Sequence, residues 1–186
     1  AFFGEQFGDA VPLLERLDET FFENPTASLG YISCAPYHRG DRVVLIGDAA
    51  HAIVPFYGQG MNAAFEDCTV LDALLADAGG DVPAAIARFS RERKPDADAI
   101  RDLALWNFIE MRSRVADDAF LERKALEAVL AAAFPEHVVN LYGLVTFSNV
   151  PYAEARRRAK AQWELLDDDA ARLGLLTFGL LRQLHT

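Results

Sequence analysis

Cysteine is scarce in this sequence. Among its 186 residues only Cys34 and Cys68 occur, and neither belongs to a C-x-x-C pair. A disulfide framework is therefore excluded. The four histidines have no ligand-like spacing with one another or with the cysteines, so we expect no metal site.

The sequence also has fewer positive than negative charges and no long apolar run. Lys and Arg number 18 against 28 Asp and Glu, which gives a formal net charge of −10. Neutralising nucleic-acid phosphates requires a basic surface, so we do not expect nucleic acid as the main partner. The apolar stretches at residues 125–134 and 173–181 are too short or too interrupted to span a bilayer, and no signal segment opens the chain. We therefore expect a cytoplasmic protein without a membrane span.

The remaining composition is typical of a globular chain. Hydrophobic residues make up 52% of it, and the 12 glycines and 8 prolines are ordinary numbers, which excludes disorder and collagen-like repeats. The sequence begins at Ala1 without an initiator methionine, which favours the removal of an upstream segment.

Glycine and proline positions divide the chain into a strand-containing region and a helical remainder. Residues 2–23 predict one or two short helices, and residues 29–35 predict a strand. Residues 42–46 give the clearest strand, with the unbroken aliphatic run of a strand buried on both faces. Helical spacing and first-turn prolines then predict helices over residues 61–75, 83–93, 95–115, 118–133, 151–166 and 170–184, with an apolar segment over 138–147 left unassigned.

The expected fold is an α/β fragment followed by a helical region, predominantly α with about two strands. A two-stranded sheet cannot stand alone with open edges, so the exposed apolar faces favour self-association.

The informative stretch is residues 47–62, Gly-Asp-Ala-Ala-His-Ala-Ile-Val-Pro-Phe-Tyr-Gly-Gln-Gly-Met-Asn. Asp48 follows the predicted strand 42–46, and ligands of open α/β sheets gather at that end of a strand. Its carboxylate can therefore accept hydrogen bonds from ribose or ribityl hydroxyls. A simpler interpretation makes Asp48 a helix N-cap or turn residue. We expect His51 to be a hydrogen-bonded structural residue rather than a general base.

The loop that follows favours the ligand interpretation. Gly58 and Gly60 place no side chain where a planar ring could approach the backbone, and Pro55 stiffens the entry of the loop. A helix then opens at Gly60, and the free amides of Met61 and Asn62 would face a ligand. The positive end of that helix favours negative charge on a bound group.

Together with Glu66-Asp67-Cys68, this string resembles the second flavin-binding motif of class A flavoprotein aromatic hydroxylases. Lys94-Pro95-Asp96-Ala97, Asn107 with Glu110-Met111, and residues 145–152 further resemble the branch of that family that hydroxylates L-kynurenine. The resemblance implies the C-terminal part of a glutathione-reductase-like FAD-binding monooxygenase fold. It also implies a set of cofactor-binding residues, Asp48, Pro55, Gly58, Gly60, Met61 and Asn62.

In that family FAD carries the chemistry and NADPH is the co-substrate, so the resemblance implies no catalytic side chain here. The ribose of FAD would meet Asp48, and its ring would lie against the amides of Met61 and Asn62. The pyrophosphate-binding G-x-G-x-x-G string of the family does not occur between Ala1 and Thr186. This implies that the N-terminal half of the same enzyme is a missing partner and that the chain alone is inactive.

Two polar residues interrupt apolar segments in the helical region. Asn107 follows Ile100 and Leu103 at helical spacing, so its amide needs a buried partner, and the hydroxyl of Tyr142 has the same need. The simpler interpretation makes both of them core residues bonded to neighbouring groups. The resemblance implies instead that they bind the amino-acid head of the substrate.

The resemblance further implies that Phe56 and Tyr57 flank the substrate ring, with no fixed role for Tyr57. We therefore expect residues 1–40 to be the remainder of a substrate-side layer, residues 41–80 an FAD-binding strand-loop-helix, and residues 81–186 a helical domain over the substrate pocket. The expected function is hydroxylation of L-kynurenine, a small aromatic amino acid, to 3-hydroxykynurenine. The alternatives are a class A hydroxylase of another aromatic acid and a non-catalytic helical interaction module.

Overall fold

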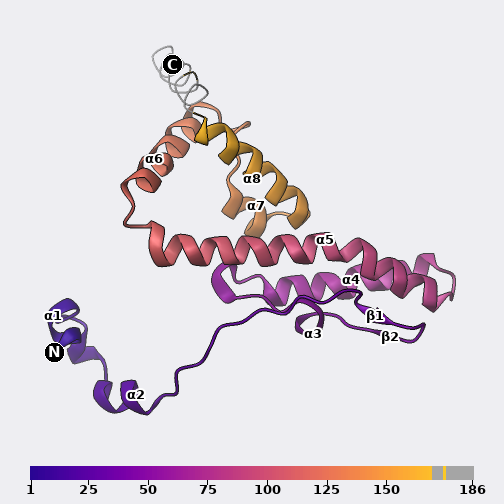
Figure 1. The fold of residues 1–186 in the computed structure, drawn as a ribbon, viewed down its shortest axis with the longest axis horizontal. Coiled ribbons are helices and arrows are strands. Elements are labelled where there is room, and N and C mark those ends of the chain that lie inside the picture. Colours follow the sequence, from indigo (N-terminus) through magenta and orange to yellow (C-terminus); the bar gives the residue numbers. More distant parts are fainter. Residues whose placement is uncertain (169–173, 175–186) are drawn as a thin grey trace.

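Helices make up most of the computed structural model, which describes residues 1–168 and residue 174 (Figure 1). The elements run in the order α1 (Phe2–Gln6), the 3-10 helix η1 (Val11–Leu13), α2 (Leu17–Glu23), β1 (His38–Arg39), β2 (Val43–Val44), α3 (Asp48–His51), the 3-10 helix η2 (Pro55–Tyr57), α4 (Gly60–Asp77), α5 (Val82–Ile109), the π-helical turn η3 (Glu110–Arg114), α6 (Asp118–Ala133), α7 (Leu141–Phe147) and α8 (Tyr152–Asp167). The expectation of a mostly helical chain with about two strands is confirmed for these residues. The helix expected over residues 170–184 lies outside them, apart from residue 174.

The two strands form a short antiparallel hairpin. His38 pairs with Val44 and Arg39 with Val43. Gly40 occupies the turn with a φ of +61°, a conformation that glycine adopts without steric cost.

Two of the strand predictions were wrong in detail. The strand expected over residues 42–46 is reduced to β2, and it is not buried on both faces, because Val43 is 53% exposed and Leu45 37%. No strand forms over residues 29–35. Burial on both faces requires neighbouring strands and covering layers, whereas each strand in the described residues has one neighbour.

The core lies where α4 and α5 pack alongside each other, with the hairpin and α3 on one side and α7 and α8 on the other (Figure 1). One buried cluster joins the hairpin region, α3, α4 and the first half of α5, and it comprises Tyr37, Ala50, Leu74, Ala85, Phe89 and Ala97. A second joins α4, α5, α7 and α8, and it comprises Ala63, Ala99, Ile100, Leu103, Val145, Tyr152 and Ala155. Helix α5 therefore connects the hairpin and α3 to α7 and α8.

Helix α5 continues through Pro95, although the sequence predicted a break between residues 93 and 95. Proline lacks an N–H and costs a helix interior about 3 kcal/mol. Burial of Phe89, Ala97 and Ile100 on the two sides of Pro95 offsets that cost. The starts of α5, α6 and α7 coincide with capping residues, since the side chains of Asp81, Asp117 and Asn140 accept backbone N–H groups there.

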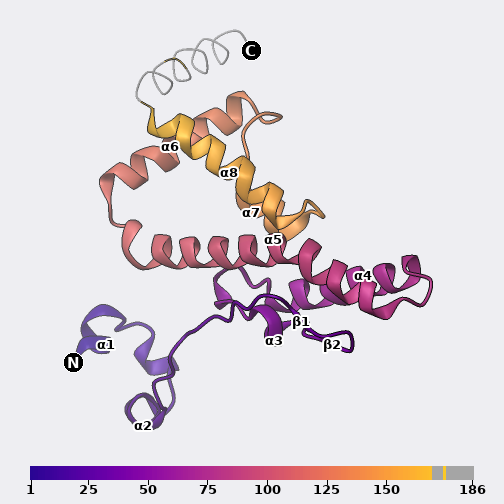
Figure 2. The ribbon, with the colours of Figure 1, turned by 45° about the vertical axis from the view of Figure 1, so that its right-hand side comes forward.

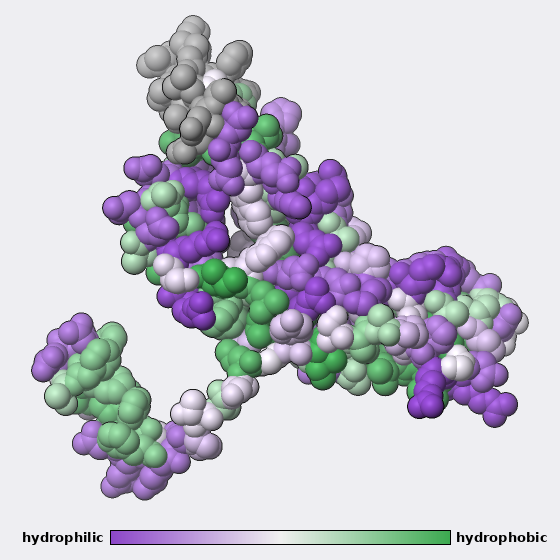
Figure 3. Space-filling model, viewed as in Figure 1, coloured by the Kyte–Doolittle hydropathy of each residue, from purple (hydrophilic) through white to green (hydrophobic). Residues whose placement is uncertain are grey.

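The N-terminal helices α1 and α2 lie apart from the other helices in both ribbon views (Figure 2). Their aromatic side chains pack edge to face, with ring centroids 5.6 Å apart for Phe2 and Phe3 and 5.5 Å apart for Phe3 and Phe21. Phe2 and Phe22 remain exposed, and hydrophobic side chains gather on the visible face of this part in Figure 3. None of the described helices has the length and the continuous apolarity needed to cross a bilayer. The three-part division of the chain stays a prediction.

Candidate functional site

The segment between β2 and α3 is fixed by Gly47. Its φ is +58°, it is buried, and a Cβ added there would come within 3.2 Å of the Ala64 Cβ on α4. Only glycine combines this left-handed conformation with such close packing. Asp48 is then the first residue of α3, with Gly47 rather than Asp48 in the N-cap position, and its carboxylate is exposed. The N-cap interpretation of Asp48 is therefore wrong, and its side chain can reach a ligand.

The loop from Pro55 to Asn62 has the predicted form. Pro55 opens η2, Gly58 ends it with a φ of +66°, and α4 begins at Gly60. The first helical hydrogen bond of α4 joins the Ala63 N–H to the Gln59 carbonyl at 2.9 Å. The amides of residues 60–62 therefore precede the bonding ladder of the helix and are available to a ligand.

Open space beside the two glycines fits the approach of a planar group. A Cβ added at Gly58 would meet no heavy atom within 4 Å, and one at Gly60 would meet only the Ile53 Cγ1 at 3.8 Å. Met61, in the first turn of α4, is 68% exposed. A ring could thus lie against this backbone without displacing protein atoms.

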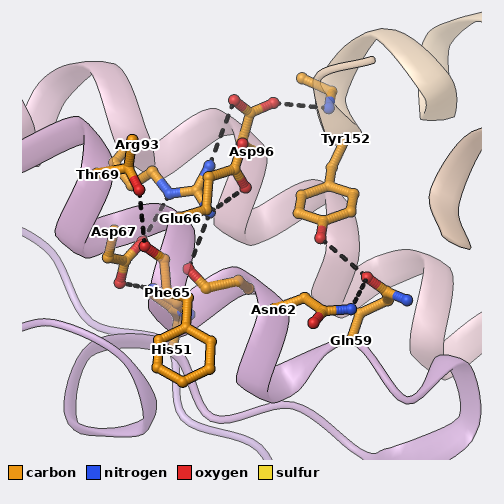
Figure 4. A network of polar contacts seen from close by, with 12 residues as sticks. His51, Gln59, Asn62, Phe65, Glu66, Asp67, Thr69, Arg93, Asp96 and Tyr152 are labelled. Carbon is orange, nitrogen blue, oxygen red and sulfur yellow. Dashed lines mark hydrogen bonds and ion pairs between the residues drawn. The ribbon is translucent and has the colours of Figure 1, made fainter. Parts of the chain in front are cut away.

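A buried charged network lies directly behind this motif (Figure 4). Asp67 on α4 is 0% exposed, and its Oδ2 accepts the Gly47 N–H at 2.8 Å and lies 2.6 Å from Nε2 of His51. Arg93 on α5 is 2% exposed and donates from Nε to the Asp67 Oδ1 at 2.6 Å. Its Nη2 donates to the Ala63 carbonyl at 3.2 Å. His51 is hydrogen-bonded, as expected, and only 5% exposed, and its structural role stays a prediction.

Asp67 and Arg93 each stabilise the charged form of the other. Burial acts to raise the pKa of Asp67, but hydrogen bonds from His51, Arg93 and Gly47 outweigh it and hold that pKa below its usual range. Burial acts to lower the pKa of Arg93, but Asp67 and Glu66 raise it. Asp67 is therefore a carboxylate and Arg93 a guanidinium at neutral pH.

Asp67 and Arg93 were not predicted as site residues, although their positions on the helices indicated that they need partners. Asp67 lies at helical spacing between the buried Ala63 and Leu74, and Arg93 lies between Phe89 and Ala97 in the same way. A charged residue on the apolar face of a helix must be paired or hydrogen-bonded. The spacing therefore shows that each of these two charges needs a partner inside the fold.

A second set of polar contacts joins α8 to the glycine loop (Figure 4). The buried Tyr152 hydroxyl donates to Oε1 of Gln59 at 3.1 Å, and the Asn62 Nδ2 donates to the same oxygen at 3.1 Å. At the start of α8, the Ala153 N–H donates to Asp96 of α5 at 2.8 Å. Burial raises the pKa of Tyr152 to about 12, with Glu66 adding to the rise, so the phenol stays protonated at neutral pH.

Three of the four residues predicted to bind substrate line one cavity of about 450 Å³, namely Tyr57, Asn107 and Tyr142. The rings of Tyr57 and Tyr142 are stacked, with centroids 6.0 Å apart and planes at 26°. Burial raises the pKa of Tyr57 to about 12, and Glu110 and Tyr142 contribute to the rise. The cavity also carries charge, because the Nζ of Lys124 lies 3.2 Å from the carboxylate of Glu110.

The fourth predicted residue, Phe56, is placed differently. Its ring packs on Phe108 with centroids 4.6 Å apart, and its carbonyl accepts a 2.7 Å hydrogen bond from the Asn107 Nδ2. Asn107 thus has the backbone-carbonyl partner that the simpler interpretation requires. An amide nitrogen has two N–H groups, so the second can still donate into the cavity.

A larger and more apolar groove of about 830 Å³ lies between α6, α7 and α8 and is lined by residues such as Leu130, Phe134 and Leu166. None of the residues predicted from the sequence to bind cofactor or substrate lies in it. The smaller, polar cavity and the glycine loop are therefore the candidate functional site.

Residues 15–104 match the family model described as an FAD binding domain. That match includes the whole glycine loop as well as Asp67 and Arg93, and it ends before Asn107.

Over a larger part of its length the chain is similar to curated kynurenine 3-monooxygenases. It is 54% identical to that of Myxococcus xanthus over 152 residues, which are 82% of this chain and 32% of the relative. It is 48% identical to that of Flavobacterium psychrophilum over 155 residues, 83% of this chain and 35% of the relative. It is 44% identical to that of Salinispora tropica over 176 residues, 95% of this chain and 39% of the relative. The resemblance seen in the sequence is confirmed, and the chain spans roughly a third of the length of these relatives.

Proposed function

We propose that this chain supplies the second FAD-contacting segment and the substrate cavity of a monooxygenase that hydroxylates L-kynurenine to 3-hydroxykynurenine. The observation that carries the proposal is that two groups able to bind a ligand lie next to the buried network of Asp67. These are an exposed carboxylate at the start of α3 and a glycine-flanked helix N-terminus at the start of α4. The similarity to kynurenine 3-monooxygenases supports the choice of substrate.

Different residues of the site bind different parts of FAD. Asp48 holds hydroxyl groups of the ribose or ribityl chain of FAD, and the amides of Met61 and Asn62 lie against its ring system. Pro55, Gly58 and Gly60 shape the loop around it. When bound, FAD supplies the redox chemistry, with NADPH as reductant and O2 as oxygen donor. The protein positions the substrate and excludes water, so no side chain of this chain is assigned a chemical step.

Substrate binding is assigned to the cavity that Tyr57, Asn107 and Tyr142 line. Amide and phenol donors suit the carboxylate of an amino acid, and the stacked tyrosines suit an aromatic ring. An aromatic substrate without a carboxylate would leave these donors unpaired. Among aromatic acids, the similarity to kynurenine 3-monooxygenases favours L-kynurenine.

The direct test compares the natural protein in which this sequence occurs with the 186 residues alone. We expect the natural protein to bind FAD stoichiometrically and to consume NADPH faster when L-kynurenine is added. We expect the 186 residues alone to bind FAD weakly and to hydroxylate nothing, because they hold no G-x-G-x-x-G string for the pyrophosphate. Equilibrium dialysis measures both affinities, and tight stoichiometric binding by the 186 residues would contradict the second expectation.

Replacing Asp48 by alanine should weaken FAD binding. Hydrogen bonds that involve a charged group contribute about 1.5–3 kcal/mol, so the FAD dissociation constant of the natural protein should rise by about 10- to 100-fold. The matched control is Asp72→Ala, an exposed carboxylate on α4 outside the loop. Flavin fluorescence titration measures both variants, and an unchanged constant for Asp48→Ala would remove this residue from the cofactor site.

A further inference from the structure

One carboxylate is bonded to both segments that face the cofactor in the proposed function. Asp67 belongs to α4, the helix whose first turn carries the Met61 and Asn62 amides. Its Oδ2 also accepts the N–H of Gly47, the residue directly before Asp48, at 2.8 Å. The exposed ligand-facing groups thus share a fully buried anchor.

Arg93 completes this anchor from the neighbouring helix. Its Nε bonds to the Asp67 carboxylate at 2.6 Å, and its Nη2 bonds to the carbonyl of Ala63, the residue after Asn62, at 3.2 Å. A guanidinium has a planar set of donors, so these contacts fix both the carboxylate and the first turns of α4 against α5.

We propose that Asp67 and Arg93 are positioning residues for the cofactor, which set the Gly47–Asp48 turn and the N-terminus of α4 in the geometry that binds FAD. The proposal rests on the proposed function, because it concerns the same cofactor. Neither side chain is exposed enough to touch a ligand, so both act through the backbone segments that they hold.

The contacts around Asp67 require a carboxylate at this position. The two oxygens of Asp67 receive donors from Gly47, His51 and Arg93. An asparagine in its place has one acceptor oxygen and an NH2 group, so one of these donors would face another donor. The Gly47–Asp48 turn can relax only with difficulty, because Gly47 already packs closely on Ala64.

The experiment uses the natural protein in which this sequence occurs and the variant Asp67→Asn. The matched control is Leu74→Ala, a buried residue of the same helix that lies seven residues after Asp67 and packs in the α4/α5 core. For each protein we would measure the FAD dissociation constant by flavin fluorescence, the melting temperature of the apoprotein, and the visible circular dichroism of bound flavin. All binding is measured well below the melting temperatures.

We expect Asp67→Asn to raise the FAD dissociation constant about tenfold or more and to alter the visible circular dichroism. Leu74→Ala should lower the melting temperature at least as much while changing the constant less than about threefold. Arg93→Lys, which keeps the charge and loses the planar donors, should give a smaller rise than Asp67→Asn.

Three results would overturn the inference alone. The first is unchanged FAD affinity and dichroism in Asp67→Asn, and the second is an equal rise in the constant for Leu74→Ala. The third applies if Asp67→Asn does not fold, in which case unchanged affinity in Arg93→Lys decides against it. A parent protein that binds no FAD at all would instead overturn the proposed function, and this inference with it.

Discussion

Arg93→Met should lower the free energy of unfolding of this chain by about 3–5 kcal/mol, because it leaves the Asp67 carboxylate buried without its counterion. Asp67 is fully buried and Arg93 is 2% exposed, so water cannot take the place of the guanidinium without opening the α4/α5 contact. Urea denaturation followed by the fluorescence of Trp106 and Trp163 measures the change. These two rings lie in contact between α5 and α8, with centroids 5.2 Å apart.

The loss should depend on pH in a defined direction. In the parent chain the pKa of Asp67 is lowered, so its contribution to stability is present above the unfolded-state value of about 3.9 and is lost as the pH falls through the folded-state value. Without Arg93, the pKa of Asp67 loses one of the hydrogen bonds that lower it, while burial and the bonds from His51 and Gly47 remain. That pKa therefore rises, and the variant is penalised most where Asp67 is charged. The stability difference between parent and Arg93→Met should therefore narrow as the pH falls from about 7 to about 4.

Two further variants test the cause of this loss. Arg88→Met makes the same substitution on the same helix at a surface ion pair with Glu92, and it should leave the free energy of unfolding almost unchanged. Asp67→Asn combined with Arg93→Met removes the buried charge, so the double variant should be more stable than the sum of the single losses predicts by about 0.5–3 kcal/mol. Strict additivity would mean that the two residues stabilise the chain independently.

The sequence predicted most helices well because their limits are local features. Helix α6 covers Asp118–Ala133 as predicted, with Asp117 as its cap. Helix α8 begins at Tyr152, one residue after the predicted start, and Pro151 is its N-cap rather than part of its first turn. The break at Pro95 was predicted wrongly, because the packing that keeps α5 continuous comes from distant helices. The strands were predicted poorly for the same reason, since burial of a strand depends on its neighbours in the sheet.

In the candidate site, too, features set by neighbouring residues were predictable, whereas contacts between residues far apart in the sequence were not. The glycine loop was recognisable because Gly58 and Gly60 act through their own backbone and spacing. The pairing of Asp67 with Gly47 and Arg93 joins residues 20 and 26 positions apart, and no local pattern specifies such a contact. The partner of Asn107 is the Phe56 carbonyl, 51 positions away. The sequence could only show that these polar groups needed partners.

Asn107→Ala and Tyr142→Phe should each raise the dissociation constant for L-kynurenine in the natural protein, while FAD content stays intact. A lost donor to a charged acceptor costs about 1.5–3 kcal/mol, which corresponds to about 10- to 100-fold in affinity if no water replaces it. Both residues line the 450 Å³ cavity, and one N–H of Asn107 is already committed to Phe56. Poorer positioning of the substrate should also release more hydrogen peroxide per NADPH consumed.

The two variants also separate substrate binding from a structural role. If Asn107 only holds the loop through the Phe56 carbonyl, Asn107→Ala should lower the melting temperature and leave kynurenine affinity per folded molecule unchanged. Tyr142 is 56% exposed, so Tyr142→Phe should have little effect on stability, and its effect on affinity reports the lost hydroxyl. Asn149→Ala and Tyr31→Phe make matched changes at exposed positions outside the cavity and should alter neither property. Isothermal titration with L-kynurenine and thermal melting of the same samples give both quantities, and unchanged affinity in both cavity variants would move the substrate site elsewhere.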